Sequence, residues 1–160
     1  MAVLKTAAFQ ALLDGDIANI VSDDRQGVAI RHEFNVPTAI AAADTVILGY
    51  VGGRYVMPEL GSFTADGVGT ALTLSIGTGI YDATANTHTI IDADDVMLST
   101  NAAALLHKGL APATGAQPAG VATRIAPAQN KVIFATVSAE TGGELTGCIL
   151  DLPFSLSSAD

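Results

Sequence analysis

The chain of 160 residues has the length of one domain that can bury a hydrophobic core. Hydrophobic residues make up 49% of it and charged residues only 14%, below the roughly 25% of a free soluble protein, so we expect other subunits to cover part of its surface. The formal net charge of −9 and the scattered positions of the seven Lys and Arg residues argue against direct nucleic-acid binding and against docking on an anionic membrane.

Residues 1–27 are predicted to form a peripheral N-terminal segment. Residues 4–13 (LKTAAFQALL) have the pattern of a short amphipathic helix, and turn-forming residues interrupt the stretch that follows. The segment is either an arm that docks on a neighbouring subunit or a first helix packed on its own domain. It lacks the long apolar core of a signal peptide, and no run of about 18 apolar residues exists, so we expect synthesis in the cytoplasm without a recognisable export signal and without a membrane span.

A β-domain is expected over residues 28–160. Alternating apolar and polar residues at 28–36 predict a half-buried strand, whose apolar face carries Val28, Ile30, His32, Phe34 and Val36. Residues 44–51 are apolar on both faces and predict a central strand. Gly52 and Gly53 then predict a hairpin turn into a strand at 54–60, where Pro58 favours an edge position.

The stretch GVGTALTLSIGTG (67–79) has the glycine content of a phosphate-binding loop. No lysine lies near it and no helix signal follows it, so both phosphate motifs are excluded. Leu72, Leu74 and Ile76 alternate with small polar residues, which predicts a strand. We expect the flanking glycines to form turns that need a positive φ.

Residues 92–108 (DADDVMLSTNAAALLHK) carry the strongest helix signal. Asp92 or Asp94 would cap the amino end, and Lys108 with Gly109 would mark the carboxyl end. The same aspartates and Asp95 lack the spacing of an EF-hand calcium loop, although a weak cation contact together with Asp82 stays open.

The remaining elements complete an all-β pattern. Residues 110–120 are predicted to be a surface loop, and strands are expected at 121–127, 131–139 and 145–154, with a turn at 142–143. Seven or eight short strands with one late helix favour an antiparallel β-sandwich or a jelly-roll-like barrel with one inserted helix.

No ionisable or nucleophilic residue falls in a catalytic or metal-binding motif. His32 is expected to be a satisfied core or interface histidine, and Cys148, the sole cysteine, a small buried side chain. Glu140 and Glu144 flank a solvated turn, and no serine stands in a G-x-S-x-G motif. The three histidines are far apart in the sequence: His32, His88 and His107. We therefore expect no catalytic, cofactor-binding or metal-binding residues, no cofactor and no enzymatic activity.

Four stretches succeed one another in an informative order. An Asp-Thr-Val-Ile-Leu-Gly strand (44–49) precedes the alternating strand with its Gly-rich turn (71–79) and the acidic, Ala-rich stretch (92–106). Lys-Val-Ile-Phe-Ala-Thr-Val, Thr-Gly-Gly-Glu-Leu and a hydrophobic strand follow at 131–154. In this order and composition residues 44–154 resemble small tailed-bacteriophage virion proteins of the capsid decoration (cement), head-stabilising type.

The resemblance implies a non-enzymatic β-sandwich on the outer surface of an icosahedral head. It implies a homotrimer or homodimer that contacts several subunits of the major capsid protein and stabilises the shell against the pressure of packaged DNA. Two alternatives stay open. The first is another virion component, such as a tail-tube, head-completion or fibre-base protein. The second is an enzyme or small-ligand-binding domain that uses residues 109–120 as a lid.

Overall fold

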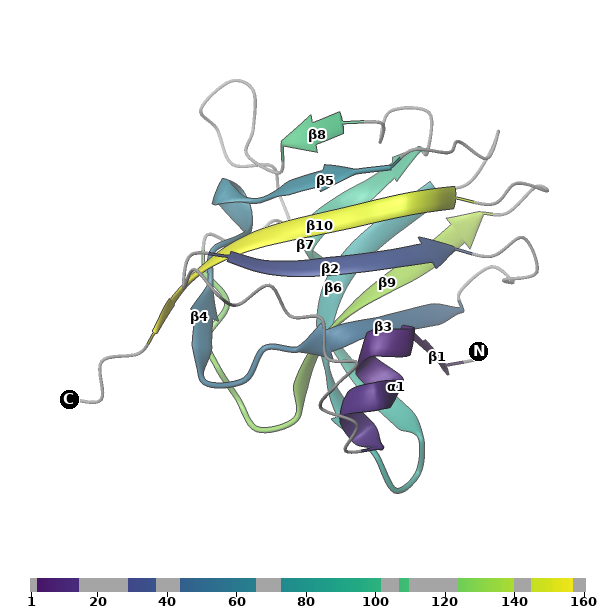
Figure 1. Ribbon diagram of the computed structural model, residues 1–160, viewed down its shortest axis with the longest axis vertical. Helices are drawn as coiled ribbons and strands as arrows, with labels where there is room; N and C mark the ends of the chain where they lie inside the picture. The colour runs from purple at the N-terminus through teal and green to yellow at the C-terminus, as the bar shows by residue number, and fades with distance from the viewer. Residues whose placement is uncertain are drawn as a thin grey trace.

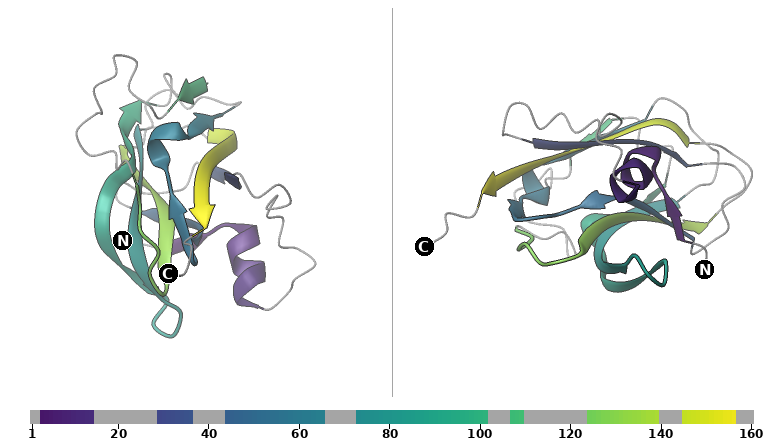
Figure 2. Two further views of the ribbon diagram at one scale, coloured as in Figure 1. Left: turned by 90° about the vertical axis from the view of Figure 1, so that its left-hand side faces the viewer. Right: turned by 60° about the horizontal axis from the view of Figure 1, so that its bottom comes forward.

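The chain folds into two β-sheets that face one another (Figures 1 and 2). The computed structural model describes residues 3–14, 29–36, 44–65, 73–101, 107–109, 124–139 and 145–156. The first sheet has the order β1 (Val3–Lys5), β3 (Thr45–Tyr50), β9 (Lys131–Ala139), β6 (Thr73–Asp82), β7 (Thr87–Asn101). The second has the order β2 (Ala29–Val36), β10 (Leu145–Leu156), β5 (Ser62–Thr64), β8 (His107–Gly109), and β4 (Arg54–Val56) also pairs with β10.

This architecture confirms the expected mainly-β fold of sandwich type. One pairing departs from a purely antiparallel arrangement, because β1 runs parallel to β3. The strand β10 is the centre of the second sheet, since β2, β5 and β4 all pair with it. An ion pair between Arg31 and Asp151, 2.8 Å apart, joins β2 to β10 on their exposed side.

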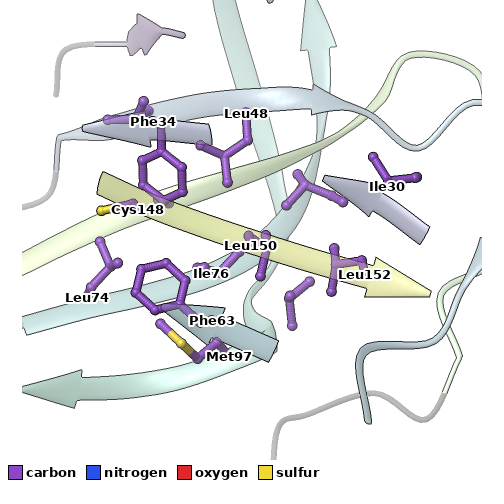
Figure 3. Close-up of a cluster of buried hydrophobic side chains, with 14 of the residues drawn as sticks. Ile30, Phe34, Leu48, Phe63, Leu74, Ile76, Met97, Cys148, Leu150 and Leu152 are labelled. Atoms are coloured by element: carbon purple, nitrogen blue, oxygen red, sulfur yellow. The ribbon is translucent and has the colours of Figure 1, made fainter. Parts of the chain in front are cut away.

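The core lies between the sheets and takes side chains from β2, β3, β4, β5, β6, β7, β9 and β10 (Figure 3). In β2 the expected alternation is confirmed, because Ile30, Phe34 and Val36 are buried while the residues between them include the exposed Arg31 and Glu33. The labelled side chains converge from both sheets: Ile30, Phe34, Leu48, Phe63, Leu74, Ile76, Met97, Cys148, Leu150 and Leu152.

A second, smaller cluster explains why β3 and β9 are apolar on both faces. Val132 and Phe134 point away from the main core and pack with Phe9 of the helix α1 (Ala7–Leu13), which lies beneath β3 in Figure 1. The side chain of Thr6 begins this helix by accepting the N–H of Phe9 at 3.1 Å. Residues 3–14 thus pack on the first sheet as a first helix would, and residues 15–27 of the N-terminal segment lie outside the described residues.

The helix predicted over 92–108 is wrong. Residues 92–101 continue β7 in an antiparallel ladder with β6, residues 107–109 form β8, and residues 102–106 lie outside the described part of the chain. The acidic start and the Lys-Gly end are local signals. They are overridden because the strand buries Val96 and Met97 in the main core and pairs its backbone with β6.

The hairpin predicted around Gly52 and Gly53 is also wrong, although the turn itself is present. Gly52 has the positive φ of +65° that the turn requires, but β4 then pairs with β10 and not with β3. The strand ends at Val56, and Pro58 begins a short 3-10 helix, η3 (Pro58–Leu60). Of the strand predicted at 121–127, the described residues 124–127 contribute one isolated bridge, between Val56 and Ile125.

The glycines at the end of the 67–79 stretch lie inside β6 and do not form turns. Ile76 and Thr78 of β6 face Met97 and Asp92 of β7, so the four β7 residues between the latter two have only Gly77 opposite them. This bulge carries β7 across the face of Gly77, where an added Cβ would overlap the backbone of the bulge. The need for glycine here is close approach of two backbones, not a positive φ.

Residues 66–72, with Gly67 and Gly69, lie outside the described residues, as do the loop at 110–120 and the turn at 142–143. The predicted strands at 131–139 and 145–154 are confirmed as β9 and β10.

Candidate functional site

The acidic group of Asp92, Asp94 and Asp95 lies at the β7 bulge and not at a helix start. Asp92 accepts the N–H of Asp94 at 3.2 Å, which is a turn-like contact within the bulge. Asp95 points inward and is 8% exposed. Its Oδ2 accepts a hydrogen bond of 2.7 Å from the hydroxyl of Thr78, and its Oδ1 has no hydrogen-bond partner among the described residues.

The environment of Asp95 disfavours its charged form. Burial raises the pKa of this carboxyl to about 6, and the neighbouring Asp92 adds to the rise, while the Thr78 hydrogen bond and Lys131 oppose it. Since the folded-state pKa is above the unfolded value, a charged Asp95 costs stability at neutral pH, and this cost disappears as the pH falls below 6.

We therefore expect Asp95→Asn to raise the free energy of unfolding at pH 7 by about 1 kcal/mol, because the amide keeps an acceptor for Thr78 without the buried charge. Urea unfolding at pH 7 and pH 4 measures the effect, which should be absent at pH 4. Asp94→Asn, at a more exposed site of the same bulge, is the matched control. A loss of stability at pH 7 in Asp95→Asn would show that the ionised carboxylate stabilises the bulge.

The structure does not bring Asp82 to the acidic group. The Asp82 carboxylate accepts the N–H groups of Thr84 and Ala85 in the β6–β7 turn, four residues along β6 from Thr78, or about 14 Å at the usual strand rise. Within the described part of the chain, no group of three or more His, Cys, Asp or Glu side chains is placed to hold a metal ion.

His32 lies between the sheets. We expected its imidazole to be fully hydrogen-bonded, and the structure differs from this expectation. The ring packs over Gly49 of β3, so closely that a Cβ on this glycine would lie 2.7 Å from the ring carbon Cε1. The Nε2 atom is buried without a hydrogen-bond partner among the described residues. Burial, followed by the charge of Arg54, lowers the pKa of His32 to about 4, while Asp151 acts in the opposite direction.

The other residues that the sequence analysis considered as possible site residues lie apart from one another in the fold or outside the described residues. The ring of His88 packs at a tilt of 53° against that of Phe134, with ring centroids 4.7 Å apart. Neither ring nitrogen of His88 has a hydrogen-bond partner in the described residues, and burial lowers its pKa. Cys148 is buried in the main core, as expected. The backbone of His107 belongs to β8, while Glu140 and Glu144 lie outside the described residues.

A shallow depression lies between the β3–β4 turn and the turn before β9. Its lining includes Tyr50, Gly53, Pro127, Gln129 and Asn130. The lining residues include no Asp, Glu, His, Lys, Arg, Cys or Ser, and Tyr50 is the one titratable side chain among them.

The most distinctive surface feature is a set of exposed apolar side chains. Ile80, Ile90 and Ile91 are 36%, 43% and 54% exposed and gather at the β6–β7 hairpin. Leu60 of η3 is 62% exposed. In Figure 1 the β6–β7 hairpin projects at the bottom, whereas the turn between β4 and β5 that holds η3 lies at the upper left. Leu4 of β1 is 37% exposed, so the described residues expose large apolar side chains at three places, of which only the hairpin gathers several.

Comparison of the chain with protein-family models, with curated proteins and with solved structures found no match in any of the three. None of the helices in the described residues is both long enough and apolar enough to cross a membrane.

The hairpin surface was missed by sequence reasoning, although its signal was present. Residues 87–91 (THTII) do not alternate between apolar and polar residues, but four of the five are β-branched and none carries a formal charge, which favours a strand. The acidic residues that follow instead indicated the start of a helix. The Thr78–Asp95 contact has no sequence signal, because it depends on the bulge that brings the two residues together.

Proposed function

We propose that the chain is a non-enzymatic viral structural protein, a capsid decoration (cement) protein that binds the outer surface of the major capsid protein shell and stabilises the phage head. The observation that supports the proposal is the exposure of large apolar side chains at separate places of a charge-poor, mainly-β domain, chiefly at η3 and at the β6–β7 hairpin. A decoration protein needs such surfaces, one toward the shell and one toward its own copies. Neutral β-surfaces also bury area without a large desolvation cost.

The face around η3 is the proposed contact with the shell. Leu60 is the most exposed of the large apolar residues, and it stands on a short rigid element held by Pro58 and by the hydrogen bond from the Gly61 N–H to the Pro58 carbonyl. A large apolar side chain that stands exposed on such an element has the chemistry of an interface anchor.

The test adds the purified protein to expanded heads that lack it, followed by co-sedimentation and by heating or chaotrope treatment of the heads. We expect saturable binding and heads that resist higher temperature. Leu60→Asp should weaken binding about tenfold, or about 1.4 kcal/mol. Gln129→Asp adds the same charge at an exposed site in the turn before β9 and should bind normally.

A folded protein that does not bind such heads would falsify the decoration role. Self-assembly into rings or tubes would instead favour a tail component, the first of the alternatives. Equal binding by Leu60→Asp and the native chain would leave the shell contact to another face and would contradict its assignment to η3.

A further inference from the structure

The strand β7 forms one edge of the first sheet, and none of the described strands pairs with its outer side. Natural edge strands are usually protected by charge, proline or a bulge. Residues 87–91 (THTII) contain no charged residue and no proline, and the ladder with β6 is regular from Thr87 to Ile90, with the first register shift at Ile91. This edge therefore presents free backbone groups from Thr87 to Ile90, beside two exposed isoleucines, Ile90 and Ile91.

The register identifies which backbone groups face the free edge. The N–H of Tyr81 donates to the carbonyl of Asn130 at 2.9 Å, so Tyr81 points toward β9. Its neighbours on β6 then point toward β7, and their partners Thr87 and Thr89 point back toward β6. The residues between and after these, His88 and Ile90, direct their N–H and C=O groups outward.

From this geometry we infer that β7 pairs antiparallel with β7 of a second copy of this chain, about a two-fold axis that passes through Thr89. In this register His88 of each copy faces Ile90 of the other, and these are the residues whose backbone groups point outward. The two facing pairs form the hydrogen-bonded pairs of an antiparallel ladder, and Thr89 faces Thr89 in the pair without hydrogen bonds.

The distribution of charge favours a second copy of β7 as the pairing partner, in the register centred on Thr89. A second copy brings the same uncharged five residues, so the ladder contains no facing carboxylates even though each chain carries a net charge of −9. The regular ladder ends at Ile90, because the register shifts at Ile91 and the residues after Asp92 cross the face of Gly77, away from the edge. The pairing also shields Ile90, which contacts His88 of the second copy on one face of the joined sheet.

The inference does not depend on the proposed capsid role, because the dimer is expected of the purified protein without heads. Sedimentation velocity over a wide range of protein concentration should show a monomer–dimer equilibrium. Ile90→Lys should raise the dimer dissociation constant at least about tenfold, since it places a charge in the ladder of both copies. Ile90→Pro should act alike, because the N–H that it removes faces outward and not toward β6.

Leu4→Lys is the matched control. Leu4 is 37% exposed and lies on β1, the opposite edge of the same sheet. It should leave the dimer unchanged, and circular dichroism should show that all three variants are folded. A dimer lost in Leu4→Lys and kept in both Ile90 variants would overturn the inference in favour of the β1 edge, and a folded native chain that stays monomeric at every concentration would overturn it outright.

Cysteine cross-linking tests the register itself. Thr89→Cys should form a disulfide dimer under mild oxidation, since the Cα atoms of such facing pairs are about 4.5 Å apart. Thr87→Cys changes an exposed threonine two residues away, but its counterpart would lie about 14 Å along the ladder and should not cross-link. The native Cys148 is buried and should not compete. Equal cross-linking of both variants, or none at Thr89→Cys, would contradict the two-fold axis at Thr89.

Discussion

Gly77→Ala is expected to lower the free energy of unfolding by about 3 kcal/mol, because one added methyl group has no space to occupy. The new Cβ would overlap the carbonyl oxygen of Asp92 and would lie 2.7 Å from that of Ala93. Both are backbone atoms of the bulge, which is itself fixed by the Thr78–Asp95 hydrogen bond and by the burial of Val96. No rotamer change can relieve the overlap, so β7 must separate from β6.

Chemical unfolding of Gly77→Ala and Gly53→Ala gives the comparison. Gly53 is exposed, its φ lies outside the left-handed region, and an added Cβ would have nothing within 4 Å. Gly53→Ala should therefore be neutral or slightly stabilising, since alanine restricts the unfolded chain more than glycine does. In thermal unfolding, Gly77→Ala should lower Tm by roughly 10 °C. Equal stability of the two variants would show that the bulge moves aside at little cost.

Acid is expected to destabilise the protein through His32 by about 3 kcal/mol between pH 6.5 and pH 4. Above pH 6.5 the imidazole is neutral in the folded and unfolded chains, and it contributes no pH dependence. Below that value the unfolded chain binds a proton, whereas the folded chain does not until the pH approaches 4. The free energy of unfolding therefore falls as the pH falls through this window.

The comparison of the native chain with His32→Leu isolates this effect. Leucine is apolar and similar in size, so it fills the space over Gly49 without the unpartnered Nε2. His88 destabilises in the same direction and Asp95 in the opposite one, but both are present in each protein and cancel in the difference. The difference in free energy of unfolding between His32→Leu and the native chain should grow toward pH 4. Above pH 6.5 this difference should not change with pH. Parallel curves over the whole range would show that His32 gains its proton without cost.

The sequence predicted the elements whose pattern is periodic and local. The strand at 28–36 was found because one face buries Ile30 and Phe34 and the other does not. β3 and β9 were found because each is buried on both faces, by the main core and by the cluster around Phe9. The pairing of the strands could not be predicted from the sequence. The strand β4 pairs with β10, about a hundred residues away along the chain, and not with its neighbour β3.

The helix prediction for the acidic stretch at 92–108 was wrong for a related reason. Its capping and stop signals describe a helix in isolation, but the choice is decided by contacts with β6, which the local pattern does not contain. The exposed apolar surface at the β6–β7 hairpin was not predicted for the same reason. Exposed isoleucines are evident only once β7 is placed at a sheet edge with Ile80 beside it.

The central position of β10 has a consequence for biosynthesis. During translation β2 emerges early, yet its partner is made more than a hundred residues later, as the Arg31–Asp151 pair shows with its separation of 120 residues. Until then β2 and β4 lack the strand with which they pair, and β5 has only the short β8, so the nascent chain carries unpaired strands while it leaves the ribosome. The second sheet therefore forms only after β10 has left the ribosome, and chains that stop before Leu145 are expected to be substrates for chaperones and proteases.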